Sequence, residues 1–130
     1  MPFVRISLKT ARSAAERLAI ADAVHRSLRA VDVPIQDRFQ IIETCGENMI
    51  VDPDYLGISR DDGAIFVEIH LSAGRSVDKK RALYRALAEE LEQAGVERRN
   101  IFVHLVETTL ENWSFGDGIA QYADRPPAHV

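Results

Sequence analysis

The sequence predicts an α/β (α+β) fold in which two duplicated βαβ units form one four-stranded mixed sheet with two helices on one face. Three observations predict it. The chain matches itself at a shift of 63 residues, each copy opens with an alternating apolar strand, and each strand is followed by a helix with one apolar stripe. The chain has 130 residues, 46% of them hydrophobic, which suits one globular domain with a single core.

The internal repeat aligns residues 3–39 with residues 66–102 without a gap. Eleven aligned positions are identical, where chance would give about two. A shared apolar periodicity would produce some of these matches by itself, but Arg12-Ser13 also matches Arg75-Ser76, and this pair is polar. We therefore expect a single domain (1–130) with repeats at about residues 2–44 and 64–108, a linking loop at 45–63 and a tail at 109–130.

The first unit begins with a strand, because Val4, Ile6 and Leu8 alternate with polar residues at the period of a strand with one buried face. Ser13 is the expected N-cap of the following helix, and Glu16 completes a capping box. Pro34 closes this helix, and a strand is expected at residues 38–44. The apolar stripe of the helix comprises Leu18, Ala21, Val24, Leu28 and Val31.

The second unit repeats this order. A strand is expected at residues 65–71, Ser76 is the next N-cap, Gly95 closes the helix, and a last strand is expected at 101–107. The stripe of this helix comprises Leu83, Leu87, Leu91 and Ala94. Each helix joins two parallel strands by a right-handed crossover, so both helices are expected on the same face.

The linking loop is long for a connection and is rich in Gly, Pro and Asp. Two interpretations are equally open: a functional or mobile loop, or a short strand at 49–51 packed on the sheet. The sheet face opposite the helices is expected to expose apolar surface around Phe66 and Phe102. Such a face indicates an oligomer that packs sheet against sheet.

Composition excludes several classes of function. The net charge is -4 and no run of Lys or Arg is long enough to follow a phosphate backbone, so no nucleic-acid partner is expected. A single cysteine, Cys45, excludes a disulfide framework and a multi-cysteine zinc site. His25 and His104 have no other ligands at metal-binding spacing, so no metal and no cofactor are expected. No apolar run reaches about 18 residues and no leader pattern is present, so we expect a cytoplasmic protein without a membrane partner.

Several segments together resemble one known family. They are Met1-Pro2 before the first strand, Pro34, residues 37–41, Gly74-Arg75-Ser76 before the second helix, and the tail segment 113–121, which reads WSFGDGIAQ. This set is similar to the tautomerase superfamily (4-oxalocrotonate tautomerase-like), and most of all to its malonate semialdehyde decarboxylase-like group. The resemblance runs from Pro2 to about Tyr122, and the tryptophan-containing tail is its most specific part. It implies that Met1 is removed, that the freed Pro2 nitrogen is the catalytic group, and that the protein forms homotrimers.

Pro2 is the first candidate catalytic residue. A free N-terminal proline is a secondary amine, nucleophilic and basic, whose protonation is tuned into the working pH range by burial or by a neighbouring charge. Without the resemblance, Pro2 is simply a favourable second residue before a strand. While Met1 is attached, the Pro2 nitrogen is an amide that neither accepts a proton nor forms an iminium.

The resemblance implies roles for Asp37 and Arg75 as well. Asp37 is the aspartate near the proline, where it stabilises the protonated amine or orients a water; otherwise it is a turn residue. Arg75 holds the substrate carboxylate in a bidentate fork; otherwise it is a solvated arginine at a helix start, like Arg12. The decarboxylase group has a further arginine, and Ala73 stands in its place here, which puts decarboxylase activity in doubt.

Three further residues are candidates for substrate binding. His70 alternates with Ile69 and Leu71 and lies shortly before Arg75, so it either contacts substrate or is a satisfied strand residue, the second being favoured. Trp113 and Phe115 either wall the pocket or seal the trimer, with packing favoured.

The leading hypothesis is an enzyme that catalyses keto-enol tautomerisation of a small oxo acid, or hydration or decarboxylation of a 3-oxo acid such as malonate semialdehyde. The alternative is a non-catalytic trimeric binding or structural module on the same scaffold. A third hypothesis, a ferredoxin-like domain that senses a metabolite in the linking loop, is weaker because that loop has no Gly-rich phosphate cradle.

Overall fold

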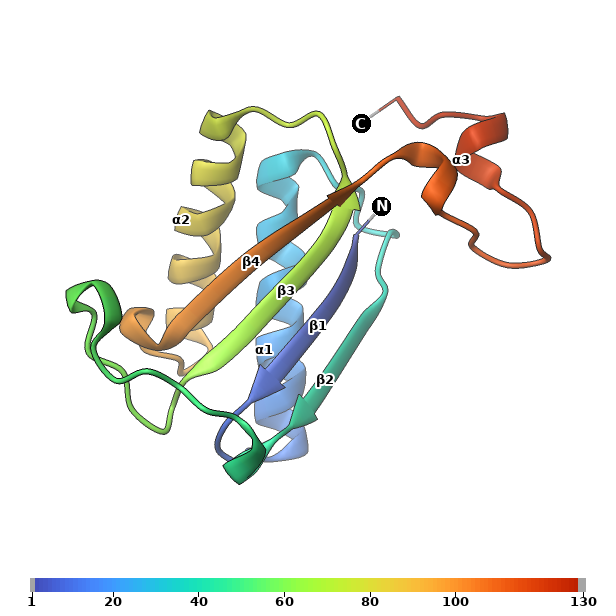
Figure 1. Ribbon diagram of the computed structural model, residues 1–130. Coiled ribbons are helices and arrows are strands. Elements are labelled where there is room, and N and C mark those ends of the chain that lie inside the picture. The colour runs from blue at the N-terminus through green and yellow to red at the C-terminus, as the bar shows by residue number, and fades with distance from the viewer. Residues whose placement is uncertain (1, 129–130) are drawn as a thin grey trace.

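A computed structural model describes residues 2–128 of the chain, so Met1, which the resemblance implies is removed, lies outside the described residues. Four strands form one sheet in the order β2-β1-β3-β4 (Figure 1). They are β1 (Phe3–Leu8), β2 (Gln40–Thr44), β3 (Ile65–Ser72) and β4 (Ile101–Thr108). β1 pairs with β2 and β3 pairs with β4 in parallel, whereas the central pair β1 and β3 is antiparallel. The predicted mixed sheet is therefore confirmed.

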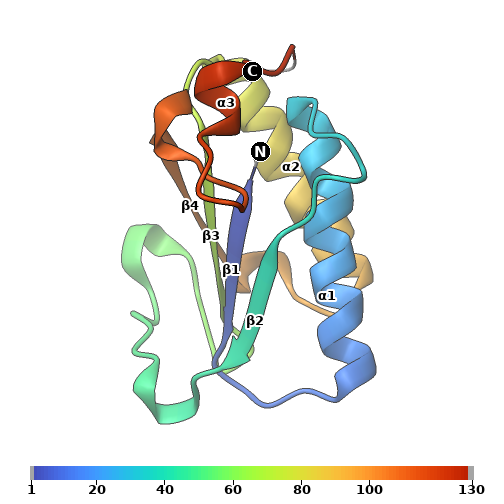
Figure 2. The ribbon, with the colours of Figure 1, turned by 90° about the vertical axis from the view of Figure 1, so that its right-hand side faces the viewer.

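Two long helices, α1 (Ala14–Ser27) and α2 (Val77–Gln93), cover one face of the sheet, as Figure 2 shows. Alternate side chains of each strand point toward them, because successive strand residues face opposite sides. Both units contribute to the resulting core, whose fully buried side chains include Ile6, Leu8, Ile20, Leu28, Ile65, Ile69, Leu83, Leu87 and Leu91. The one-sided, two-layer arrangement thus agrees with the prediction.

Both helices begin where the sequence indicates. The Ser13 backbone N–H donates to Glu16 Oε1 at 3.0 Å, and the Glu16 N–H donates to Ser13 Oγ at 3.1 Å, which completes the predicted capping box. At α2, the Lys79 N–H donates to the Ser76 hydroxyl at 3.2 Å. These local hydrogen bonds satisfy amides that have no partner inside the helix.

The first helix ends differently from the prediction. α1 stops at Ser27 and continues as a 3₁₀ turn, Leu28–Val31, which ends at Asp32 in a left-handed conformation with a φ of 64°. The helical path is therefore broken before Pro34, and β2 begins at Gln40, two residues later than expected.

The assignment of Leu18 to the buried stripe is wrong, because its side chain is 60% exposed. Ile20, Val24 and Leu28 recur every four residues and are all buried. Residues two apart lie about 200° apart around a helix, so Leu18 faces away from the sheet when Ile20 faces it.

The linking loop contains no strand, so the interpretation of residues 49–51 as a short strand is wrong. Two 3₁₀ turns, Gly46–Asn48 and Tyr55–Gly57, shape it instead. Met49 is buried and its carbonyl accepts a hydrogen bond from Lys9 Nζ at 2.6 Å, whereas Ile50 is 90% exposed. Met49 therefore anchors the middle of the loop, and contacts such as the hydrogen bond of Thr10 to the Asp62 carbonyl hold its end.

The open face of the sheet is less apolar than expected. Strand pairing aligns Arg5 with Glu68 and Glu68 with His104, which puts a polar row across the middle of this face. Apolar surface remains near one end, where Phe66 and Phe102 pack with ring centroids 5.1 Å apart and Phe102 is half exposed. The prediction of a bare apolar face holds at the ends of the sheet and fails at its centre.

No helix within residues 2–128 is both long enough and apolar enough to cross a lipid bilayer.

Candidate active site

One end of the sheet collects most of the candidate residues (Figure 1). The parallel strands β1 and β2 begin at this end, and β3 and β4 finish there because the central strand pair is antiparallel. Pro2 directly precedes β1, Arg75 shortly follows β3, and the tail leaves β4 at the same end. Strand pairing thus brings residues from the two halves of the chain together.

A cavity of about 240 Å³ lies at this end, and Pro2 is buried in its wall. Its lining residues are Pro2, Phe3, Phe39, Trp113, Ser114 and Phe115. A molecule of liquid water occupies about 30 Å³, so the cavity is large enough for a small organic acid. Its aromatic lining is largely apolar, and electrostatic interactions are stronger beside apolar walls than in water.

The tail builds one side of this cavity. Trp113 stacks on Phe115 with ring centroids 5.7 Å apart, and Phe115 stacks on Phe39 at 6.5 Å. The Gln121 side chain accepts a hydrogen bond from the Phe115 N–H at 2.9 Å and donates one to the Gly116 carbonyl at 3.0 Å. Trp113 and Phe115 are therefore placed as cavity walls, in an arrangement that the tail itself fastens.

Asp37 lies in the turn before β2 and is 8% exposed. Its backbone N–H donates to the Pro34 carbonyl at 3.0 Å, so Asp37 also has the turn role of the alternative interpretation. Two residues later, the Phe39 carbonyl accepts a hydrogen bond from the Val4 N–H at 3.0 Å. This contact holds the turn against the start of β1, and hence Asp37 at the same end of the sheet as Pro2.

Arg75 is half-buried just before the N-cap of α2. Its Nε donates to the Val31 carbonyl at 3.0 Å and its Nη1 to the Ser72 carbonyl at 2.9 Å. Burial lowers the pKa of Arg75, against the opposing effects of the Asp32 and Glu107 carboxylates. Its Nη2 is buried without an acceptor among residues 2–128. Arg75 does not line the cavity, but its guanidinium is fixed at the same end of the sheet, with Nη2 unused by residues 2–128.

His70 is not brought into the cavity. Its Nε2 lies 2.5 Å from Glu68 Oε1, and its ring packs on Phe3 with centroids 5.8 Å apart. It is half-buried and paired within its own strand, which agrees with the favoured interpretation of a satisfied strand residue.

Tyr122 is the site residue that sequence reasoning missed. Its ring meets Phe115 edge-on with centroids 4.7 Å apart. Burial raises the pKa of Tyr122, the Asp37 carboxylate raises it further, and Arg75 lowers it. Tyr122 therefore lies near both charged site residues. The signal that would have found it is the aromatic series Trp113, Phe115 and Tyr122, which crosses the tail at the end of the matched segment.

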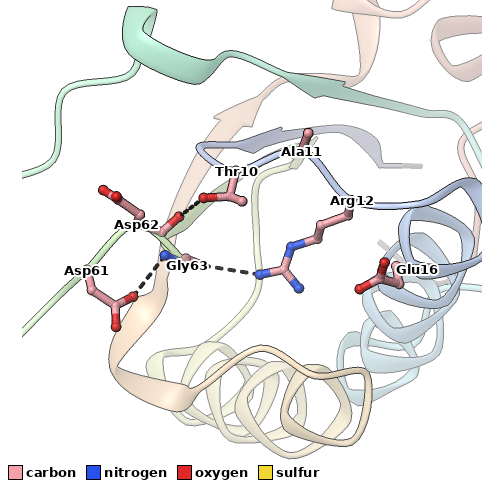
Figure 3. A pocket seen from close by; sticks show the side chains of 7 residues that line it. All are labelled: Thr10, Ala11, Arg12, Glu16, Asp61, Asp62 and Gly63. Carbon is pink, nitrogen blue, oxygen red and sulfur yellow. Dashed lines mark hydrogen bonds between the residues drawn. The ribbon is translucent and has the colours of Figure 1, made fainter.

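A larger cavity, of about 620 Å³, lies at the opposite end of the sheet (Figure 3). In its wall the Thr10 hydroxyl donates to the Asp62 carbonyl at 2.5 Å, and Arg12 Nη2 donates to the Gly63 carbonyl at 3.4 Å. The acidic side chains around it do not form a metal site: no three His, Cys, Asp or Glu residues within 2–128 are grouped so as to hold an ion. This end carries none of the candidate site residues.

Comparison with known proteins gives consistent matches. Residues 37–116 match the family model described as "Tautomerase enzyme". A curated relative from Bacillus subtilis (strain 168), "Probable tautomerase YusQ", is 35% identical over 124 residues, which cover 93% of this chain and 98% of the relative.

Solved structures extend the similarity. A malonate semialdehyde decarboxylase, FG41, inhibited by 3-bromopropiolate, has a TM-score of 0.90 and 35% identity, covering 97% of this chain and 98% of the other. A second malonate semialdehyde decarboxylase, described with decarboxylase and hydratase activities, has a TM-score of 0.87 and 27% identity, covering 94% and 96%. A fused 4-OT described as a symmetric trimer has a TM-score of 0.75 at 19% identity, covering 95% and 99%, and shows the shared fold alone.

Proposed function

The chain belongs to the tautomerase family, and from this premise we propose that it is a cofactor-free enzyme that acts on a small oxo acid through the amine of Pro2. One observation carries the proposal: Pro2 is buried in the wall of an aromatic cavity at the sheet end that also holds Asp37 and Arg75. Removal of Met1 would turn the Pro2 nitrogen into a secondary amine facing this cavity.

Asp37 sets the protonation of that amine in the proposed mechanism. A carboxylate close to an ammonium group favours the charged form. We expect Pro2 to be largely cationic at neutral pH, and so better suited to polarise a carbonyl than to abstract a proton. A pKa of Pro2 below about 7, measured by NMR titration of protein lacking Met1, would contradict this role of Asp37.

Arg75 supplies the binding charge for the substrate carboxylate. Its contacts to the Val31 and Ser72 carbonyls fix the guanidinium plane and leave Nη2 without an acceptor among residues 2–128. Trp113 Nε1 is likewise buried without an acceptor in that range. A buried donor with no acceptor costs about 1–3 kcal/mol. A carboxylate in the site would relieve part of this cost, which supports an anionic substrate.

The similar malonate semialdehyde decarboxylases support decarboxylation of a 3-oxo acid as the reaction. In that reaction the bond between the carboxylate and the α carbon breaks, and its electron pair moves into an enolate whose oxygen the cationic Pro2 stabilises. Carbon dioxide leaves, and the α carbon takes a proton from water. Keto-enol tautomerisation also passes through an enolate, which forms when the enol oxygen gives up its proton to a base and is consumed when the neighbouring carbon takes a proton; no carbon dioxide is lost.

Ala73 weighs against efficient decarboxylation. The decarboxylase group has an arginine there, and without this charge the carboxylate that leaves is held less firmly out of the plane of the carbonyl. We expect weak but detectable activity on malonate semialdehyde, raised in part by Ala73→Arg. An Ala73→Arg variant without any gain would show that the missing arginine is not the cause of weak decarboxylation.

A Pro2→Ala variant tests the proposed chemistry. It should lower kcat/KM on the enol form of phenylpyruvate at least about tenfold, because a primary amine keeps some basicity but loses the placement of the ring nitrogen. Intact mass of both untagged proteins must first show that Met1 is absent. An unchanged rate in such protein would rule out the proline mechanism, and retention of Met1 would favour the non-catalytic module.

We also propose a homotrimer. The half-exposed Phe102 and Phe39 leave apolar surface at both ends of the open sheet face, and the fused 4-OT of similar fold is a symmetric trimer. Light scattering should give three times the mass of the chain. A stable monomer at micromolar concentration would contradict this assembly.

A further inference from the structure

His25 is a buried histidine of α1 that the proposed mechanism does not use. Its side chain is 8% exposed, and its Nε2 lies 2.7 Å from the Ile35 carbonyl oxygen. A carbonyl oxygen only accepts hydrogen bonds, so Nε2 carries the hydrogen and donates it. Nδ1 is buried without a partner among residues 2–128. The ring is therefore oriented by its hydrogen bond to the segment before β2.

The carbonyl that His25 holds belongs to the turn that carries Asp37. The Asp37 N–H donates to the Pro34 carbonyl at 3.0 Å, which closes a β-turn over residues 34–37. Ile35 is the second residue of this turn, so its carbonyl is part of the central peptide, whose orientation differs between turn types. The Ile35 side chain is more than half exposed, so its packing contributes little. The hydrogen bond from His25 therefore fixes the central peptide of the turn.

α1 also holds the chain on the other side of Asp37. Arg38 Nη2 donates to Asp22 Oδ1 at 2.6 Å, and both side chains of this ion pair are about one-third exposed. Ion pairs that remain open to water contribute little, because the solvent screens them. His25 instead supplies a buried attachment, two residues before Asp37.

We propose that His25 is a positioning residue, which holds Asp37 at its working distance from the Pro2 amine by fixing the Ile35 carbonyl. The inference rests on the proposed function, because it needs Asp37 to act on that amine. The imidazole itself touches neither the substrate nor the reacting atoms. The attraction between a carboxylate and an ammonium group falls with distance, so a turn that is free to reorient would weaken it. The Pro2 amine would then lose its proton at lower pH.

The variant His25→Leu tests this role, because it removes the donor and keeps a side chain of similar volume. In protein lacking Met1, NMR titration should give a Pro2 pKa at least about 0.5 lower than in the parent. The pH dependence of kcat/KM on the enol form of phenylpyruvate should shift to lower pH to the same extent.

Two further substitutions of His25 complete the test. His25→Gln should keep the parent pKa of Pro2, because its side-chain amide can donate to the same carbonyl from the place of Nε2. His25→Asn has a shorter side chain that leaves the carbonyl without this donor, so it should lower the pKa of Pro2. It replaces His25→Leu if that variant does not fold.

Ser27→Ala is the matched control for lost stability. The buried Ser27 hydroxyl donates to the Ala23 carbonyl at 2.8 Å within α1, away from the turn. Its removal should lower the melting temperature and leave the pKa of Pro2 unchanged. In an Asp37→Asn background, His25→Leu should have no further effect on the pKa of Pro2, since residues that act through one another are not additive.

An unchanged pKa of Pro2 in His25→Leu would overturn the inference and leave the proposed function standing. An equal lowering in Ser27→Ala, or a full further lowering in the Asp37→Asn background, would also overturn it, because His25 would then not act through the turn and Asp37. Full activity in Pro2→Ala would overturn the proposed function instead. The pKa of Pro2 in His25→Leu would still decide whether His25 positions Asp37.

Discussion

The two ends of the sheet are built from the same elements, yet they differ in chemistry. A cavity of about 270 Å³ at the far end is lined by Ile50, Val51, Asp52, Tyr55, Arg60, Phe66 and Phe102. The repeat shift of 63 residues carries Phe3 and Phe39 of the Pro2 cavity onto Phe66 and Phe102, and Trp113 onto Ile50. The duplicated chain has therefore formed the same kind of cavity twice, once at the start of each pair of parallel strands.

The residues that would do chemistry are not duplicated. Pro2 corresponds to Ile65, which lies within the chain and has no amine to free. Asp37 corresponds to Asn100, whose Nδ2 donates to Asp61 Oδ1 at 2.8 Å and whose Oδ1 accepts from the Asp61 N–H at 3.1 Å. At one end this position holds the buried carboxylate of Asp37. At the other end it holds the side-chain amide of Asn100, which is hydrogen-bonded to Asp61 of the linking loop.

The starts of the helices differ in the same way. Arg12 and Arg75 are equivalent, but the third helical position holds Glu16 in α1 and Lys79 in α2. Glu16 caps its own helix and lies beside Arg12 (Figure 3). Lys79 forms an ion pair with Asp32. In the proposed function, one end of the duplicated fold binds an anionic substrate, while the other end uses its charges for structure.

The largest effect is expected from making the active end resemble the far end. Asp37→Asn should lower kcat/KM about a hundredfold, because the carboxylate that stabilises the cationic amine or orients a water is lost. The pH dependence of kcat/KM should shift to lower pH in this variant, since an amide no longer favours the protonated amine.

The reverse change, Asn100→Asp, is the matched control for Asp37→Asn. It should leave kcat/KM unchanged and lower the melting temperature, because a second carboxylate would face Asp61 Oδ1. A loss of activity in Asn100→Asp without a loss of stability would mean that the far end also contributes to function.

An intermediate effect is expected from the equivalent arginines. Arg75→Ala should raise KM at least about tenfold on a carboxylate substrate, because its guanidinium provides the binding charge. Arg12→Ala should leave KM unchanged, since Arg12 has one long contact to the Gly63 carbonyl at 3.4 Å. Equal effects of the two substitutions on KM would remove the distinction between the ends.

The smallest effect is expected from Glu16. The Ser13 backbone N–H, and then the Ser13 hydroxyl, lower the pKa of Glu16, so its contribution to stability is present above the ordinary carboxyl pKa and is lost as the pH falls through the lowered value. Glu16→Ala should lower Tm by about 2 °C near pH 7 and by less near pH 3. Thermal melts at both pH values measure this, with Glu89→Ala, an exposed position of α2, as the control. A Tm difference that grows toward pH 3 would contradict the capping role.

Much of the fold followed from local patterns. The alternation of Val4, Ile6 and Leu8, the two serine caps and the matched repeat predicted the strands, the helix starts and the mixed sheet, because each depends on neighbours within a few residues. The errors arose where neighbours in space decide. Leu18 is an apolar residue, as a buried stripe requires, but it lies on the side of the helix that faces away from the sheet. Residues 49–51 are of strand-forming types, but they have no neighbouring strand to pair with.

The candidate site, like the fold, was predictable in part from the sequence and depended in part on tertiary packing. The resemblance pointed to Pro2, Asp37 and Arg75, and the chain then places them at one end of the sheet because β1 and β3 pair antiparallel. The position of Tyr122 did not follow from the sequence, since it depends on how the tail packs.

By itself, then, the sequence determined the repeat, the secondary structure and the residue types available for chemistry, because these are carried by spacing along the chain. The tertiary structure alone decided that Pro2, Asp37 and Tyr122 come to the same end of the sheet, beside an aromatic cavity. That outcome depends on contacts between residues far apart in the chain, and the free energy of such contacts exists only once the strands and the tail have packed.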